Sequence, residues 1–160
     1  MKVYIKNKVF TLTGSSYVNN ENGAQIYEVK GKFLSPTRKK KIYDMKGNLL
    51  YIVRNKFWTW FSRYALIYDA NKNLLAKVKH GYFAVKKYTV LGYKDELTID
   101  GRFFSLESQI RKNGETCATI RRNIDLFRDS FELESSEEDM PFMTALVIAI
   151  DNITDDKQKK

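Results

Sequence analysis

A short apolar pattern recurs five times along this chain of 160 residues and constrains its fold more than any other feature. In each copy a valine or isoleucine is followed, four residues later, by a second apolar residue that is usually aromatic. The copies are 21 to 25 residues apart. The first position is held by Val29, Val53, Val78, Ile99 and Ile120, and the second by Phe33, Phe57, Tyr82, Phe103 and Ile124. Such recurrence predicts one supersecondary unit repeated along the chain.

Each copy has the alternation of a β-strand. Around the first copy, Tyr27, Val29 and Phe33 fall on one face of an extended chain. Because successive side chains of a strand point to opposite faces of a sheet, a period of two indicates a half-buried strand. Turn sequences rich in Asn, Asp and Gly separate the strands, as in "NNENG", "DMKGN", "DANKN" and "RKNGE". These residues favour hairpin turns, so the sequence predicts a mainly β fold with about twelve antiparallel strands.

A sheet of that size leaves unpaired edges unless it closes on itself. We therefore expect a closed antiparallel barrel, which has no edges. A barrel this wide has an interior that strand side chains alone do not fill. Another segment of the chain is needed inside it.

The segment "MPFMTALVIAI", residues 140–150, is the one long apolar run. It could enter a membrane, pack on a partner or fill the core of its own domain. Ser136 and Asp139 precede it with the spacing of a capping box, and Pro141 suits a first helical turn. The run is far shorter than the roughly 20 residues that cross a bilayer. We therefore expect a helix over about residues 139–152, buried in the centre of the barrel.

The boundaries of the domain follow from this reading. Residues 1–154 are expected to form a single domain, and residues 155–160 a charged C-terminal tail. The start of the chain alternates lysine with apolar residues, unlike a signal peptide. With one cysteine and no signal peptide, the sequence predicts a cytoplasmic protein, peripheral at a membrane if it binds one.

The sequence offers little for catalysis. Cys117 is the single cysteine and His80 the single histidine, and no glycine-rich phosphate loop is present. A thiol nucleophile needs a base beside it, which the sequence does not place near Cys117. His80 occupies an inward position of its strand, where a structural role is the simpler interpretation. We predict no enzyme activity, no bound cofactor and no metal site.

The charge is unevenly distributed. The net charge of +9 combines an excess of basic residues in 1–131 with an excess of acidic residues in 132–160. A basic body favours an anionic partner, although lysines also keep strand edges from aggregating. If the repeat valines point inward, the cations between them point outward. Seven candidates follow from this alternation: Lys30, Lys32, Arg54, Lys56, Lys79, Arg102 and Arg121. The run "RKKK" adds a basic cluster beside a hairpin strand, with the further anion-binding candidates Arg38, Lys39, Lys40 and Lys41.

Two tryptophans form a second candidate feature. Trp58 and Trp60 in "FWTWFSRY" alternate with the inward residue Phe57, so they are expected on the outer surface. Tryptophan anchors proteins at membrane interfaces and is also enriched in protein contacts. Packing beneath a neighbouring loop is the third interpretation.

The ordered texture of the chain resembles a known superfamily. The stretch "EVKGKFLS…KKIYDMKGNLLYIVRNKF" and the ending "RDSFELESSEEDMPFMTALVIAIDNI" resemble the tubby C-terminal-like superfamily. Within it, the similarity is to the LURP-one-related and phospholipid scramblase-like branch, especially its small bacterial LURP-one-like members. The resemblance implies a barrel around a C-terminal helix. Tubby proteins bind phosphoinositides and scramblases associate with membranes, so the resemblance also suggests binding to lipids.

The resemblance does not carry a calcium site to this chain. The scramblases bind calcium just before the terminal helix, where this sequence has Asp125, Asp129, Glu132 and Glu134. Arg128 interrupts these acids, and the spacing of a calcium loop is not evident. The cysteine cluster that anchors scramblases to lipid is also absent from the sequence.

The resulting hypothesis is a non-catalytic β-barrel module. It would bind anionic, phosphoinositide-type phospholipid headgroups peripherally through an outer basic face. The alternative is a protein-interaction or scaffold module that uses the hairpin of Trp58 and Trp60 with the acidic ending. Nucleic-acid binding stands third, because it needs exposed aromatic residues that stack on bases.

Overall fold

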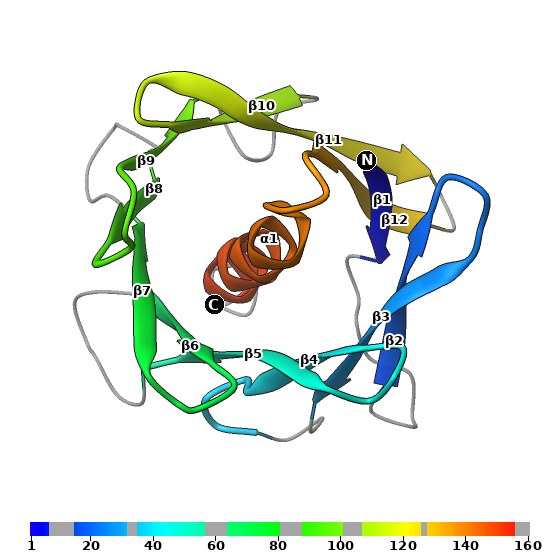
Figure 1. The fold of residues 1–160 in the computed structure, drawn as a ribbon, viewed down its shortest axis with the longest axis horizontal. Helices are drawn as coiled ribbons and strands as arrows, with labels where there is room; N and C mark the ends of the chain where they lie inside the picture. The colour runs from blue at the N-terminus through cyan, green and yellow to red at the C-terminus, as the bar shows by residue number, and fades with distance from the viewer. Residues whose placement is uncertain are drawn as a thin grey trace.

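The structure is a computed structural model that describes residues 1–6, 15–31, 35–56, 64–80, 88–100, 107–125 and 128–155. Within these ranges the chain forms twelve strands and one helix. The strands close into an antiparallel barrel, and the helix occupies the middle of the ring (Figure 1). The predicted fold class is confirmed.

Each strand pairs with its neighbours in the sequence. The strands are β1 Lys2–Lys6, β2 Ser15–Asn20, β3 Gln25–Gly31, β4 Lys40–Asp44, β5 Leu49–Asn55, β6 Tyr64–Asp69, β7 Leu74–His80, β8 Tyr88–Leu91, β9 Leu97–Asp100, β10 Glu107–Lys112, β11 Glu115–Asp125 and β12 Arg128–Ser135. Pairing of β1 with β12 joins the ends of the meander. The ring therefore has no open edge in the described chain.

The interior positions of the strands are those of the repeat. Val29, Val53 and Val78 are fully buried, and Ile99 and Ile120 are 2% exposed. The second apolar position of the repeat is not placed by the structure. Phe33, Phe57, Tyr82 and Phe103 lie outside the described residues, and so does the side chain of Ile124.

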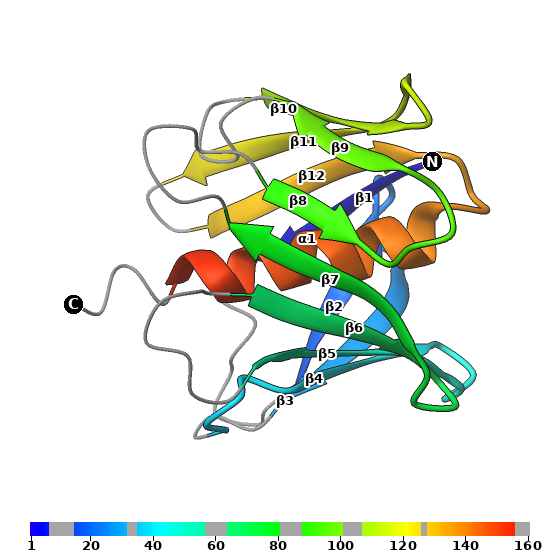
Figure 2. The same cartoon turned by 90° about the vertical axis from the view of Figure 1, so that its left-hand side faces the viewer.

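The C-terminal helix α1 spans Met140–Asp155 and runs along the barrel (Figure 2). Met143, Leu146 and Ile150 have no exposed surface, because the helix packs against β5, β6, β7 and β12. The helix continues about one turn beyond the expected end at residue 152. Asp151 and Asn152, near this end, have polar contacts with Lys40 and Arg38. No helix in the described part of the chain is long and apolar enough to span a membrane.

The start of the helix departs in one detail from the expected capping box. The Ser136 hydroxyl accepts a hydrogen bond from the Asp139 backbone N–H at 3.1 Å, as expected. The Asp139 carboxylate, however, accepts from the Ser136 hydroxyl at 3.1 Å instead of reaching back to the Ser136 backbone. Its remaining capacity is used by Lys112 of β10. The cap therefore also ties the helix to the barrel wall.

Candidate functional site

The outer wall of β4 to β7 carries the cations that concern function. At the end of β5 the side chains alternate, with Val53 and Asn55 buried and Arg54 exposed between them. Lys56 follows on the same outer face. Because alternation in a strand fixes which side chains face outward, the inward repeat determines the position of these cations.

Two strands and two connections of this wall enclose a shallow groove of about 260 Å³. Lys39, Ile52, Arg54, Tyr68 and Lys72 line it. Ile52 and Tyr68 face each other across β5 and β6, so they stand side by side. Ile52 points outward but is only 6% exposed, which gives the groove an apolar floor. Lys39, Arg54 and Lys72 provide positive charge around it.

Arg54 is held in place within the groove. It donates a hydrogen bond from Nη2 to the Tyr68 hydroxyl at 2.8 Å, and its guanidinium lies 5.1 Å from the centre of the Tyr68 ring. A guanidinium has five N–H donors, so most of its donors remain for a ligand. Among the described residues, no acidic side chain forms an ion pair with Lys39, Arg54 or Lys72. The groove is therefore positive, partly preorganised and open.

The neighbouring surface on β5 to β7 is also positive. The ammonium groups of Lys56 and Lys77 lie 5.2 and 4.1 Å from the centre of the Tyr64 ring. A hydrogen bond from Lys56, together with the positive charges of Lys56 and Lys77, lowers the pKa of the Tyr64 hydroxyl. The pKa of a phenol falls where the surroundings favour negative charge. An anionic group would meet the same favourable field.

Several cations elsewhere on the barrel are paired with acidic side chains. Lys30 pairs with Glu28 at 3.1 Å. Arg121 of β11 contacts Glu107 at 3.3 Å and Glu132 at 3.8 Å, and Lys2 contacts Glu132 at 3.2 Å. The predicted basic face is thus divided. Among the described residues, the outer wall of β4 to β7 has cations without acidic partners, whereas Lys2 and Arg121 on the wall of β1, β11 and β12 are paired with glutamates.

Two candidates are engaged with the central helix. Lys40 is 2% exposed, and its ammonium lies 3.8 Å from the Asp151 carboxylate on the helix. Lys40 stands two residues before the buried Ile42, so alternation turns it inward. Arg38 contacts the helix as well, donating from Nη1 to the Asn152 carbonyl at 3.5 Å and accepting from the Asn152 amide at 3.2 Å. The expectation that Lys40 joins an outer cluster was wrong.

The remaining candidates fall into two groups. Lys41 and Lys79 are half-buried, at the outer positions of β4 and β7. Lys32, Arg102, Trp58 and Trp60 lie outside the described residues. The tryptophan surface, and the protein contact that it was taken to suggest, therefore stay predictions.

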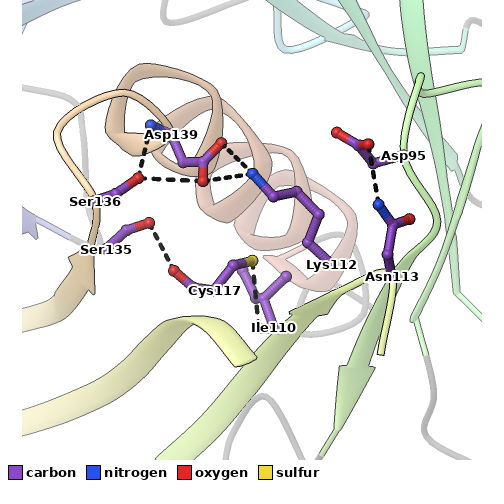
Figure 3. Close-up of polar contacts among 8 residues, drawn as sticks. All are labelled: Asp95, Ile110, Lys112, Asn113, Cys117, Ser135, Ser136 and Asp139. Atoms are coloured by element: carbon purple, nitrogen blue, oxygen red, sulfur yellow. Dashed lines mark hydrogen bonds and ion pairs between the residues drawn. The ribbon is translucent and has the colours of Figure 1, made fainter. Parts of the chain in front are cut away.

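The mouth of the barrel, where the helix begins, has its own polar cluster (Figure 3). The Lys112 ammonium donates to both Asp139 carboxylate oxygens, at 2.9 and 2.7 Å. These hydrogen bonds lower the pKa of the Asp139 carboxyl and raise that of the Lys112 ammonium. Asn113 donates to Asp95 nearby at 3.2 Å. Lys112 therefore holds the start of the helix to β10, and Asn113 holds the end of β10 to the connection between β8 and β9.

The two residues considered for catalysis, Cys117 and His80, have contacts that are typical of structural residues. The Cys117 thiol donates to the Ile110 carbonyl at 3.4 Å, and burial raises the pKa of this thiol. A raised pKa keeps the thiol protonated and weakly nucleophilic at neutral pH. The His80 ring packs edge-on against Tyr88, with 5.0 Å between ring centres. Neither arrangement resembles a nucleophile with its base.

No metal site is formed by the described residues, where no three His, Cys, Asp or Glu side chains come together. Glu132 from the acidic segment is engaged by Lys2 and Arg121. The side chains of Asp125 and Asp129 lie outside the described part.

Sequence reasoning missed three groove residues, Ile52, Tyr68 and Lys72. Lys72 lies in the turn between β6 and β7, outside the repeat on which the candidates were based. Tyr68 joins the site through the register that places it opposite Ile52. The outward position of Tyr68 was readable from its neighbour Ile67, which is buried, but its partner across the strands was not.

Comparison with known proteins places this barrel in a family. The uncharacterised protein YxjI of Bacillus subtilis (strain 168) is 23% identical over 154 residues, which cover 96% of this chain and 93% of that protein. An X-ray structure of a protein from Arabidopsis thaliana has the same fold, with a TM-score of 0.66 and 16% identity over 96% of this chain and 91% of its own. The family model described as LURP-one-related matches residues 1–151. The chain therefore belongs to the LURP-one-related family.

Proposed function

We propose that the chain is a non-catalytic module that binds anionic phospholipid headgroups peripherally, through the outer wall of β4 to β7. The observation that carries this proposal is the difference between the two walls of the barrel. Among the described residues, the cations on the outer face of β4 to β7 form no ion pair with an acidic side chain, whereas Lys2 and Arg121 on the opposite wall do. Unpaired cations on one face attract an anionic surface.

The number of cations on this wall is sufficient for useful attraction. The basic wall comprises Lys39, Lys41, Arg54, Lys56, Lys72, Lys77 and Lys79. Near an anionic membrane each lysine or arginine contributes about 1 kcal/mol. Several acting together give measurable binding that weakens as salt screens the charges.

Two exposed apolar residues favour a membrane over a nucleic acid as the partner. Met45 is 50% exposed and Leu74 is 55% exposed. They belong to neighbouring hairpins at the mouth of the barrel, since Tyr51 and Asp69 pair across β5 and β6. Apolar side chains beside lysines gain free energy at the boundary between headgroups and acyl chains. Phosphates of a nucleic acid would offer them nothing comparable.

Co-sedimentation with vesicles tests the proposal. We expect little binding to phosphatidylcholine alone and clear binding when phosphatidylserine or a phosphatidylinositol phosphate is added. Raising the salt from low to physiological concentration should weaken the binding. Absence of binding to every anionic vesicle at low salt would overturn the proposal, and equal binding to neutral vesicles would do so too.

A further inference from the structure

Two hairpins of the basic wall are built on the same plan. The turns 44–48, "DMKGN", and 69–73, "DANKN", each begin with an aspartate and end with an asparagine. Asp44 accepts from the Asn48 backbone N–H at 2.8 Å and from its side-chain amide at 2.8 Å. Asp69 makes the same two contacts with Asn73, at 2.8 and 2.9 Å. The two turns can therefore be compared position by position.

The two turns differ in sequence at their second, third and fourth positions, and the fourth is the one with a positive φ. In the first hairpin this is Gly47, with a φ of +87°, and in the second it is Lys72, with a φ of +68°. Glycine adopts positive φ readily, whereas a residue with a Cβ is strained there. The first turn shows that the hydrogen bonds of this plan are compatible with glycine. Lys72 is thus in a backbone conformation that glycine adopts more readily than lysine.

A strained residue is a reason to look for a function that its side chain serves. Lys72 is one of the three cations of the groove, with Lys39 and Arg54. The corresponding Gly47 has no side chain to contribute to a site. The two observations, the backbone strain and the lining of the groove, concern the same residue but are independent of one another.

We propose that the groove is a binding site for one phosphate group on a ligand with a short apolar stem, and that Lys72 is the residue that makes it specific for phosphate. This inference rests on the proposed function and narrows it to one site. Arg54, oriented by Tyr68, offers the parallel N–H donors that bind phosphate in bidentate fashion. Lys39 and Lys72 add charge on either side, and Ile52 contacts the stem.

The substitution Lys72→Gly separates strain from binding because the two respond in opposite directions. It should raise the melting temperature by about 2–4 °C, by relieving the positive φ. It should also weaken phosphate binding about tenfold, by removing one charged donor. Lys72→Met keeps the strain and the length of the side chain but not its charge. This variant should melt like the unmodified chain and bind as weakly as Lys72→Gly.

A matched control lies in the sister hairpin. A Cβ added at Gly47 meets no atom within 4 Å, so Gly47→Ala introduces backbone strain alone. It should lower the melting temperature by about 2–4 °C and leave binding unchanged. Lys72→Met thus changes ligand affinity alone, Gly47→Ala changes stability alone, and Lys72→Gly changes both.

Binding is measured by two-dimensional NMR with inorganic phosphate and with dihexanoyl phosphatidic acid below its micelle concentration. We expect both probes to shift the signals of Arg54, Tyr68 and Lys72, with the lipid binding more tightly because its stem reaches Ile52. Equal affinity for the two probes would overturn the part played by the stem.

The same variants are then tested on anionic vesicles. Vesicle binding that is unaffected in Lys72→Gly and Lys72→Met would overturn the inference and leave the proposed function standing. Failure of the unmodified chain to bind any vesicle would overturn the proposed function itself. A melting temperature of Lys72→Gly at or below that of the unmodified chain would remove the argument from strain.

Discussion

Lys39 and Lys40 are neighbours in the sequence but belong to different regions of the molecule. Lys40 points into the barrel, where its ammonium lies 3.8 Å from the Asp151 carboxylate of the helix. Lys39 points outward into the groove, where no described acidic residue pairs with it. The interior compensates its charges, and the outer wall of β4 to β7 does not.

This difference teaches how to assign the two sets of charges. A charge removed from water costs several kcal/mol unless a partner compensates it, so an interior charge without a partner is not tolerated. An exposed cation costs almost nothing and needs no partner, so selection for binding can place it freely. Interior charges therefore serve stability, whereas unpaired outer charges are available to bind an anionic partner.

The largest effect is expected inside the barrel. Asp151→Ala leaves the Lys40 ammonium buried without its carboxylate and should lower the free energy of unfolding by about 3–5 kcal/mol. Lys39→Ala, one position away on the outer wall, should change it by less than about 0.5 kcal/mol. Urea denaturation of both variants measures the difference.

A double substitution sharpens this test. Lys40→Met with Asp151→Leu removes both charges and fills the same space with apolar atoms. Replacing a whole buried pair is often neutral, so this variant should recover most of the loss. If Asp151→Ala unfolded at the same urea concentration as the unmodified chain, the interior pair would not be compensating anything.

A smaller effect is expected at the mouth, where the ion pair is partly exposed. Asp139→Asn removes the charge that pairs with Lys112 and weakens the cap, which should cost about 1 kcal/mol at neutral pH. The pKa of Asp139 is lowered in the folded chain, so its contribution is lost as pH falls below the ordinary value of 3.8. The pKa of Lys112 is raised, so the contribution is also lost as pH rises above 10.5.

Thermal unfolding across pH measures this window. The difference between the unmodified chain and Asp139→Asn should be greatest between those two values and should shrink on both sides. A difference that stays constant down to pH 2 would mean that the charge of Asp139 plays no part in holding the helix.

An effect of similar size but opposite sign concerns a buried polar group. The Thr144 hydroxyl is fully buried on the helix and has no hydrogen-bond partner among the residues that the structure describes. Thr144→Val should therefore stabilise the fold, by about 1 kcal/mol. Thr98 is exposed on β9, so Thr98→Val should have no comparable effect. Destabilisation by Thr144→Val would show that the hydroxyl does have a partner in solution.

The sequence predicts the fold better than the site, for physical reasons. Alternation and turn residues act over a few neighbouring positions, so strands, hairpins and the buried helix can be read locally. The inward position of Lys40 was readable in the same way, two residues before Ile42. The pairing of Lys30 with Glu28, on one face of β3, was readable too.

Contacts between strands depend on register, which one sequence does not show. The groove exists because Ile52 and Tyr68 stand opposite each other on β5 and β6. Arg121 forms an ion pair with Glu107 because the register of β10 and β11 places the two residues opposite each other. The difference in ion pairing between the wall of β4 to β7 and the wall of β1, β11 and β12 is therefore a result that requires the structure.

One measurement tests the central claim, that position and not net charge makes the wall of β4 to β7 a binding surface. Two double variants are compared. One is Arg54→Glu with Lys56→Glu on the basic wall, and the other is Lys2→Glu with Arg121→Glu on the wall of β1, β11 and β12. Each changes the net charge of the chain by the same amount, and both are assayed against vesicles containing phosphatidylserine at low salt. The first variant should lose at least about tenfold in affinity and the second less than about twofold. Equal losses in the two variants would show that the chain responds only to its overall charge, and the binding wall would have to be abandoned.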